Sequence, residues 1–256
     1  MKTKPILTVS KIESFLRCEK EYQLHTLQGI SAVSGPKTGM ASSGSLGLPA
    51  ALWGTLVHEV MQFLDTPGGA NAQTVIEQAL TNQEIEDTQG RFSTQIKHLI
   101  ERMLEHDEVR HLLGEEARRE IPFFLDTGHC YLKGTIDRLT SVDGIWTVVD
   151  FKTDRLNRDK EFSARTKSYS IQMGFYALAV SKILQADVVD TALIFTDGIA
   201  VVKHRWSKED LDTVQKQLGT TVALLENKKE FAFPHDESIC PRCPYWELNY
   251  CGVRAS

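Results

Sequence analysis

Two aspartates and a lysine near the middle of the chain have the residue types and spacing to bind a divalent metal ion and an anionic substrate. Asp150-Phe151-Lys152 comes shortly after Gly134-Thr135-Ile136-Asp137-Arg138. Between them, Asp143-Gly144 is a strong signal for a two-residue hairpin turn. A turn there makes Asp137 and Asp150 face each other, with Cβ atoms about 4.5–5.5 Å apart. A hard cation such as Mg²⁺ or Mn²⁺ would relieve the repulsion between the two carboxylates.

The lysine is predicted to lie beside the two aspartates, because side chains alternate between the two faces of a strand. Lys152 is predicted on the face of Asp150, where its ammonium can reach a group bound to the ion, and Phe151 is predicted to point into the core. The alternative is a hairpin with two ordinary surface aspartates and a surface lysine. The joint spacing of the three charged groups favours the metal site.

The elements that must position these residues follow from periodicity and from cap and turn residues. A capped helix is predicted to begin near Thr8 and to carry Cys18. Helical periodicity predicts further helices near residues 50–65, 72–87, 92–107, 168–185 and 207–227. Strand-forming residues predict strands near 117–125, 129–140, 144–152 and 188–205. Early helices, a sheet in the middle and later helices indicate an α/β fold with a central mixed sheet flanked by helices.

We expect residues 1–256 to form a single domain, because the length suits one substantial core. Residues 1–110 would be an N-terminal helical annex with a flexible Gly-, Ser- and Pro-rich loop at 29–49. Residues 115–230 would form the core. Residues 231–256 would be a cysteine-rich tail packed against the N-terminal helix.

Composition and charge narrow the class of protein. The chain is 41% hydrophobic, and none of its apolar runs approaches the ~20 residues of a membrane span. It also lacks a secretory signal, so we expect a cytoplasmic protein without a membrane partner. A net charge of −5 argues against nonspecific coating of nucleic acid. Arg155 and Arg158 nevertheless begin a basic segment that could contact a phosphate backbone, the alternative being a solvated loop.

Four motifs in order resemble the RecB-like branch of the PD-(D/E)XK nuclease superfamily. They are Gly54-Thr55-Leu56-Val57-His58, Gly134-Thr135-Ile136-Asp137, Asp150-Phe151-Lys152-Thr153 and Gln172-Met173-Gly174-Phe175-Tyr176. The resemblance implies a restriction-endonuclease-like core. It also implies that His58, Asp137, Asp150 and the Phe151 carbonyl are metal ligands and that Lys152 is the catalytic lysine.

Further residues take their expected roles from the same resemblance. Gln172 and Tyr176, four residues apart on one helical face, would contact the nucleic acid or support the lysine. The alternative to such a role is that the segment is a partly buried amphipathic helix, with these residues as its polar tips. Glu120 lies where many members of the family have an acidic residue, and it is a candidate for a supporting group or a ligand of a second metal.

The implied activity is metal-dependent hydrolysis of phosphodiester bonds in DNA, which we expect to be exonucleolytic and to serve recombination, repair or CRISPR adaptation. DNA that is single-stranded or has a free end is the expected substrate. The chain lacks a Gly-x-x-x-x-Gly-Lys-Ser/Thr motif, so a helicase or CRISPR-adaptation partner would supply any motor. The alternatives are a nuclease-fold subunit without catalysis that binds DNA or a partner, and an RNA-directed enzyme of the same fold.

Four of the five cysteines could share one metal centre. Cys240, Cys243 and Cys251 cluster near the C-terminus, and Cys18 matches the outlying ligand of relatives with a [4Fe–4S] cluster, namely the AddB nuclease domain and the CRISPR-adaptation nucleases. Such a cluster would join the two ends of the chain. The seven-residue gap between Cys243 and Cys251 is longer than usual in that family, so Zn²⁺ and free thiols remain alternatives. Cys130 is predicted to be a small core residue.

Overall fold

The structure is a computed structural model that describes residues 3–30, 48–64, 71–114, 117–153, 159–232, 240, 243–247 and 250–251. The chain divides into two compact units. Unit 1 consists of Met1–Gly39, Phe124–Gly134 and Thr213–Ser256, and unit 2 consists of Met40–Phe123 and Thr135–Asp212. The domain limits expected near residues 110, 115 and 230 stay predictions.

The strands form the mixed sheet that the sequence predicts. They are β1 (Ile6–Thr8), β2 (Arg118–Asp126), β3 (Tyr131–Val142), β4 (Ile145–Lys152), β5 (Val189–Phe195) and β6 (Ala200–Trp206). The pairing order is β1-β3-β4-β5-β6, with β2 paired to β3. In unit 2, β4 is antiparallel to β3 and parallel to β5, and β5 is antiparallel to β6. Asp143 and Gly144 both have positive φ, 51° and 79°, as the predicted hairpin turn requires.

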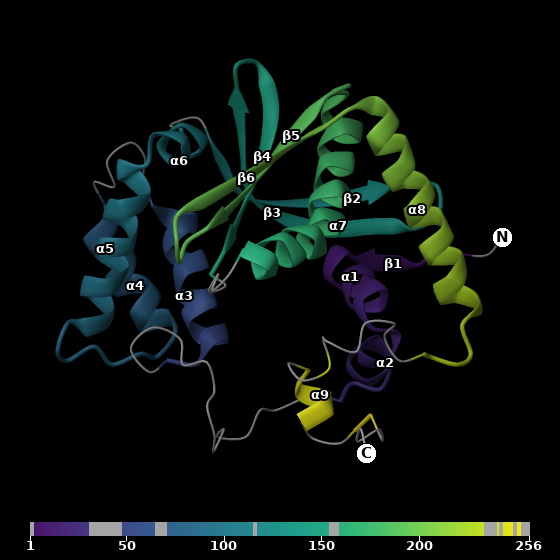
Figure 1. The fold of residues 1–256 in the computed structure, drawn as a ribbon, viewed down its shortest axis with the longest axis horizontal. Coiled ribbons are helices and arrows are strands. Elements are labelled where there is room, and N and C mark those ends of the chain that lie inside the picture. Colours follow the sequence, from purple (N-terminus) through teal and green to yellow (C-terminus); the bar gives the residue numbers. More distant parts are fainter. Residues whose placement is uncertain are drawn as a thin grey trace. The chain divides into compact units, whose positions relative to one another are not determined.

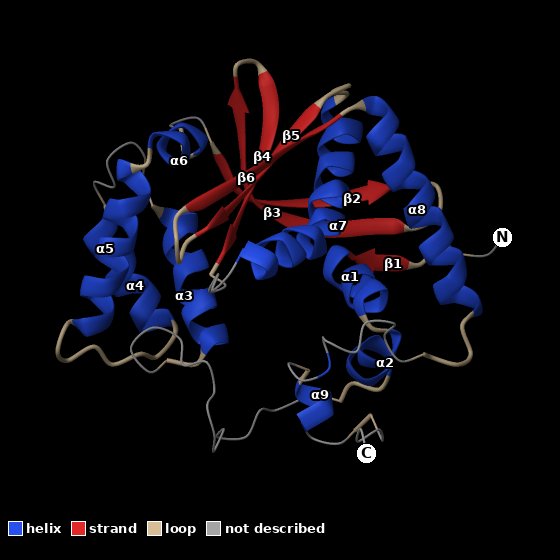
Figure 2. Ribbon diagram, in the orientation of Figure 1, coloured by secondary structure: helices blue, strands red, loops and turns tan. Residues whose placement is uncertain are grey.

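In the described part of unit 2, helices flank the strands of the same unit (Figure 1). They are α3 (Ala50–Phe63), α4 (Ala72–Asn82), α5 (Arg91–Glu105), α6 (Asp107–Leu112) and α7 (Asp159–Leu184). The apolar faces of α3 to α6 share one core with Val149 and Phe151 of β4 and Ala192 and Ile194 of β5. Lys152 instead contacts α7, so helices cover both faces of the sheet (Figure 2). The prediction that Phe151 points into the core is therefore confirmed.

Unit 1 contains β1, the helices α1 (Val9–Arg17), α2 (Glu19–Tyr22) and α9 (Pro244–Glu247), a π-helical turn (Gln23–Leu27) and most of α8 (Lys208–Asn227). Its N-terminal and C-terminal segments contact each other. Lys228 forms an ion pair with Glu19 at 2.7 Å, and the Tyr245 hydroxyl donates a hydrogen bond to the Ile30 carbonyl at 2.7 Å. Among the described helices of both units, none is long and apolar enough to cross a membrane.

Candidate active site

The hairpin of β3 and β4 brings the two predicted carboxylates to one end of the sheet in unit 2. The register inferred from the turn is confirmed from Arg138–Val149 to Val142–Ile145. Asp137 comes one residue before this paired stretch, and its carboxylate accepts a hydrogen bond from the backbone N–H of Phe151 at 3.1 Å. Asp137 is thereby fixed beside the Asp150-Phe151-Lys152 segment.

Lys152 lies on the same face of β4 as Asp150, as alternation along the strand requires. The Lys152 Nζ is 2.6 Å from an Asp150 carboxylate oxygen, and the two side chains are 14% and 2% exposed. The same amine donates a hydrogen bond to Gln172 Oε1 at 2.9 Å. The backbone of Lys152 is also fixed, because its carbonyl accepts a hydrogen bond from the Thr196 N–H at 2.8 Å. The end of β4 therefore presents an ammonium in a nearly buried position.

One face of α7 supplies the surroundings of this amine. The Gln172 amide donates to the Tyr176 hydroxyl at 3.0 Å, which leaves its oxygen for Lys152. Tyr169 lies three residues before Gln172, and Lys152 Nζ is 4.5 Å from the centroid of its ring. Tyr169 was not among the site residues predicted from the sequence, although its spacing from Gln172 and Tyr176 places it on the same helical face.

Helix α3 carries the predicted histidine toward the strands. His58 Nδ1 is 3.3 Å from the Asp137 carboxylate, and the His58 ring meets that of Phe151 edge-on at 6.4 Å. Gly54 permits a close approach one turn earlier, because a Cβ there would lie 3.1 Å from the Thr153 hydroxyl. The glycine of this motif therefore lets α3 lie against the end of β4.

Burial and neighbouring charges alter the acidity of these groups. Burial is the largest effect on the pKa of Asp150 and raises it. Together with the negative charge of Asp137, burial outweighs the charge of Lys152, which lowers the pKa, so the pKa of Asp150 rises to about 6. Burial lowers the pKa of His58, but its hydrogen bond to Asp137 and the nearby carboxylates outweigh burial, so the net shift is upward. Protons therefore compete for the same atoms as a bound cation would.

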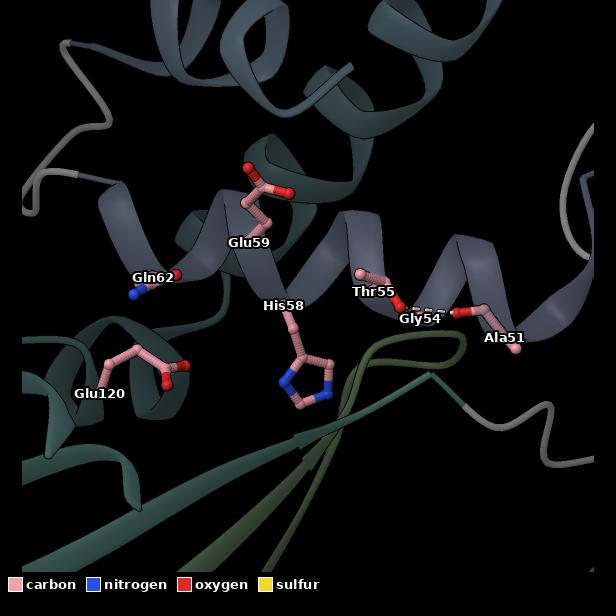
Figure 3. A pocket seen from close by; sticks show the side chains of 7 residues that line it. All are labelled: Ala51, Gly54, Thr55, His58, Glu59, Gln62 and Glu120. Atoms are coloured by element: carbon pink, nitrogen blue, oxygen red, sulfur yellow. Dashed lines mark hydrogen bonds between the residues drawn. The ribbon is translucent and has the colours of Figure 1, made fainter. Parts of the chain in front are cut away.

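A pocket of about 560 Å³ opens beside His58. It is lined by Ala51, Gly54, Thr55, His58, Glu59, Gln62 and Glu120. Figure 3 shows His58 and Glu120 on the same side of α3 and Glu59 on the other side. Glu120 has a φ of 45°, which is strained for a residue other than glycine. Burial and the charge of Asp137 raise the pKa of Glu120, which places this carboxyl in the same electrostatic environment as the site.

A buried arginine next to Asp137 ties the helices to β3. Arg138 is fully buried and donates hydrogen bonds to the carbonyls of Leu113, at 2.7 Å, and Met61, at 3.3 Å. Met61 follows His58 by about one turn of α3. Burial lowers the pKa of Arg138 to about 10, so the side chain is still charged at neutral pH. Arg138 thus positions α3, and the preceding residue, Asp137, supplies the carboxylate.

The residue types at this site fit a divalent ion, since two carboxylates are ligands that Mg²⁺ or Mn²⁺ accepts and the added imidazole makes Mn²⁺ at least as good a fit as Mg²⁺. Within the described ranges, however, no three His, Cys, Asp or Glu side chains are arranged to hold a metal ion as they stand. Asp150 contacts Lys152, and Asp137 contacts His58. Binding one ion would require these side chains to turn from their present partners. The Phe151 carbonyl stays a predicted ligand.

The four predicted cluster ligands all belong to unit 1. Cys18 lies between α1 and α2 and not within one helix, because its backbone is extended, with φ −157° and ψ 108°. Burial raises the pKa of Cys251, and the thiols of Cys243, Cys18 and Cys240 raise it further, so the four lie within electrostatic range of one another. They are not arranged as ligands of one ion in the described structure.

Other predictions about single residues differ in outcome. Cys130 is fully buried, as predicted for a small core residue, and comes just before β3. Arg155 and Arg158 lie outside the described residues. The same is true of most of the loop expected at 29–49.

Comparison with curated proteins found relatives of part of the chain, and these are named as a subunit of an ATP-dependent helicase/nuclease. The relative from Bacillus cytotoxicus is 28% identical over 178 residues, and that from Bacillus cereus strain ATCC 10987 is 30% identical over 180 residues. Each alignment covers 61% of this chain, and the chain spans only 14% of the length of either relative.

A solved structure and a protein family each match nearly the whole chain. The crystal structure of SSO0001 aligns with 99% of this chain and 90% of its own, at 13% identity and a TM-score of 0.43, a similarity too low to carry an argument. Residues 6–250 match the family described as the PD-(D/E)XK nuclease superfamily. The mixed sheet with helices on both faces agrees with that match. This chain belongs to the PD-(D/E)XK nuclease superfamily.

Proposed function

We propose that this chain is a divalent-metal-dependent DNA nuclease that hydrolyses phosphodiester bonds from a strand end. The observation that carries the proposal is the nearly buried Lys152 ammonium, which contacts both the Asp150 carboxylate and Gln172 beside the pair of Asp137 and His58. A phosphodiester is negatively charged and repels nucleophiles, so a site of this kind must supply positive charge. A buried ammonium among potential metal ligands does so.

Each residue has a proposed role in the reaction. His58, Asp137, Asp150 and the Phe151 carbonyl would hold Mg²⁺ or Mn²⁺. The bound ion would polarise the phosphate and lower the pKa of a coordinated water. Lys152 would orient the attacking water and offset the charge that develops on the phosphate oxygens. Gln172 would hold the lysine, with Tyr176 setting the orientation of the Gln172 amide; the alternative role of the two residues is contact with DNA. Arg155 and Arg158 would contact the phosphate backbone.

The test is digestion of end-labelled single-stranded and double-stranded DNA and RNA with Mg²⁺ or Mn²⁺. We expect the wild type to shorten single-stranded DNA from an end and Lys152→Ala to lower the rate by about a hundredfold or more. Lys203→Ala is a matched control, because Lys203 is a half-exposed lysine of the same unit that forms an ion pair with Glu108. The control should cut like the wild type.

Three other results would contradict parts of the proposal. Equal cutting by wild type and Lys152→Ala would exclude Lys152 as the catalyst. Binding of DNA without cutting by the wild type would favour a nuclease-fold subunit that has lost catalysis. Faster cutting of RNA than of DNA would reassign the substrate.

We further propose that Cys18, Cys240, Cys243 and Cys251 bind a [4Fe–4S] cluster, with Zn²⁺ as the alternative. The support is their mutual electrostatic influence and the direct contacts between the two ends of unit 1. Purification without oxygen should give a brown protein that contains iron and bleaches in air. Cys251→Ser should lose the metal, whereas Cys130→Ala should keep it, because Cys130 is a core residue. A colourless protein that contains zinc would reverse the assignment of the metal.

A helicase partner, or a longer protein that contains a helicase, is the proposed source of unwound DNA. The support is the name of the curated relatives, which describes part of an ATP-dependent helicase/nuclease, together with the missing nucleotide-binding motif. A CRISPR-adaptation complex is the other proposed setting. In either case, we expect this chain alone to act faster on single-stranded ends than on blunt duplex ends.

A further inference from the structure

We propose that Tyr169 is a positioning residue that holds the Lys152 ammonium through the face of its aromatic ring. The inference rests on the proposed function, in which Lys152 acts on the phosphate. Lys152 Nζ is 4.5 Å from the centroid of the Tyr169 ring, well within the range of a cation–π interaction. The lysine side chain is only 14% exposed, so little water competes with the ring.

The ring completes a set of three contacts around one flexible side chain. Asp150 approaches the amine from its own strand at 2.6 Å, and Gln172 approaches from α7 at 2.9 Å. Tyr169 and Gln172 are three residues apart on α7 and therefore share a face. Tyr169 also lies beside the buried Phe195 ring, with centroids 6.3 Å apart, which limits where its own ring can move. Together the contacts restrict the rotamers that the four-carbon chain of Lys152 can adopt.

A ring suits this position better than a third strong acceptor. An ammonium has three N–H groups. One of those of Lys152 donates to Gln172, and the contact with Asp150 is an ion pair from which the carboxylate would turn to bind an ion. A carboxylate or carbonyl in place of Tyr169 would bind the third N–H strongly. The ring face attracts the positive charge without a directed hydrogen bond to oxygen. Once Asp150 turns to the ion, the N–H groups that are not bonded to Gln172 therefore stay available for a phosphate oxygen or for the attacking water.

The test compares Tyr169→Leu with Tyr169→Phe in the digestion of end-labelled DNA. Tyr169→Leu removes the ring, and we expect kcat to fall by about tenfold, equivalent to about 1.4 kcal/mol, with little change in KM. Tyr169→Phe keeps the ring and should keep most of the activity. Tyr131→Leu is a matched control, because Tyr131 also lies near a lysine, with Lys4 at 5.6 Å, but belongs to unit 1. That control should cut like the wild type.

A double-mutant comparison shows whether Tyr169 acts through the lysine. In a Lys152→Ala background, Tyr169→Leu should cause no further loss of activity. A further tenfold loss there, or equal losses for Tyr169→Leu and Tyr169→Phe, would overturn the inference. If Lys152→Ala is inactive while Tyr169→Leu matches the wild type, the inference fails and the proposed function stands.

The contact can also be measured without any substrate. In protein labelled with ¹³C at lysine Cε, the ring should shift the methylene protons next to the Lys152 amine upfield, with the resonance assigned by its loss in Lys152→Arg. The shift should disappear in Tyr169→Leu and persist in Tyr169→Phe. A resonance that does not change in Tyr169→Leu would overturn the contact itself, even if the wild type cuts no nucleic acid.

Discussion

At the scale of single residues, the site depends on two opposite charges, those of Asp150 and Lys152, that are buried together. Asp150 is almost fully buried, and Lys152 is nearly so. A buried charge that loses its partner is strongly unfavourable, so replacing either residue alone affects the other. Lys152→Ala should therefore be judged by folding as well as by activity. A cooperative thermal transition like that of the wild type would show that lost cutting reports on chemistry.

The pKa of Asp150 leads to a prediction about metal binding. Because this pKa is raised to about 6, the carboxylate is ionised above that pH and increasingly protonated below it. His58 shifts in the same direction, so its proton also opposes binding more strongly as the pH falls. We expect Mn²⁺ affinity, measured by calorimetry, to fall by about tenfold or more per pH unit below about pH 6.

A control variant separates this competition from general effects of acid. Asp126 is a half-exposed aspartate of unit 1 paired with Lys4 at 2.7 Å, and this pairing lowers its pKa. Asp126→Asn should leave the pH dependence of Mn²⁺ binding unchanged, whereas Asp150→Asn should abolish strong binding. An affinity that does not vary between about pH 5 and about pH 8 would contradict the assignment of Asp150 as a ligand.

At the scale of elements, the β3–β4 hairpin and α7 together determine where the charged groups meet. The turn sets the register that brings Asp137 beside the end of β4, and one face of α7 supplies Gln172 and Tyr169. Helix α3 brings His58 to the same place because Gly54 allows close approach and Arg138 fixes the following turn. The site therefore depends on the register of the hairpin and on the packing of two helices, α3 and α7, against it.

The hairpin turn gives a prediction about stability. Gly144 has a φ of 79°, which residues with a Cβ adopt at a cost, so Gly144→Ala should lower the free energy of unfolding by about 1 kcal/mol. Gly198 is a matched control, since an added Cβ there meets open space and its φ is not in the left-handed region. Gly198→Ala should change stability by less than about 0.5 kcal/mol in urea unfolding. Equal losses for both variants would contradict this account of the turn.

Local signals explain why much of this arrangement could be predicted from sequence. Asp143-Gly144 determines the turn, and alternation then fixes which face Lys152 and Phe151 occupy. The short helix α6 and the break at Cys18 were not predicted, because neither carries a clear periodic signal. The strained backbone of Glu120 and the ring contact of Tyr169 were also missed. Both depend on tertiary neighbours, although helical spacing alone would have placed Tyr169 beside Gln172.

At the scale of the whole molecule, the chain combines a nuclease-type core with a second unit built from distant stretches of sequence. Unit 2 contains the described residues of the candidate site, and unit 1 contains the four cysteines proposed as cluster ligands. If those cysteines bind a cluster, removing it should destabilise unit 1 by releasing contacts between segments far apart in sequence. Thermal unfolding of the iron-loaded protein and of Cys251→Ser measures this, and identical transitions would exclude a structural role for the metal.

The central claim is that His58, Asp137 and Asp150 hold one divalent ion beside Lys152. A crystal structure of the protein grown with Mn²⁺, with the ion located by its anomalous scattering, tests this claim most directly. We predict one strong peak bonded to the His58 imidazole and to both carboxylates, with Lys152 released from Asp150 and still held by Gln172 and Tyr169. A peak elsewhere in the molecule, with the Lys152–Asp150 ion pair unchanged, would contradict the claim.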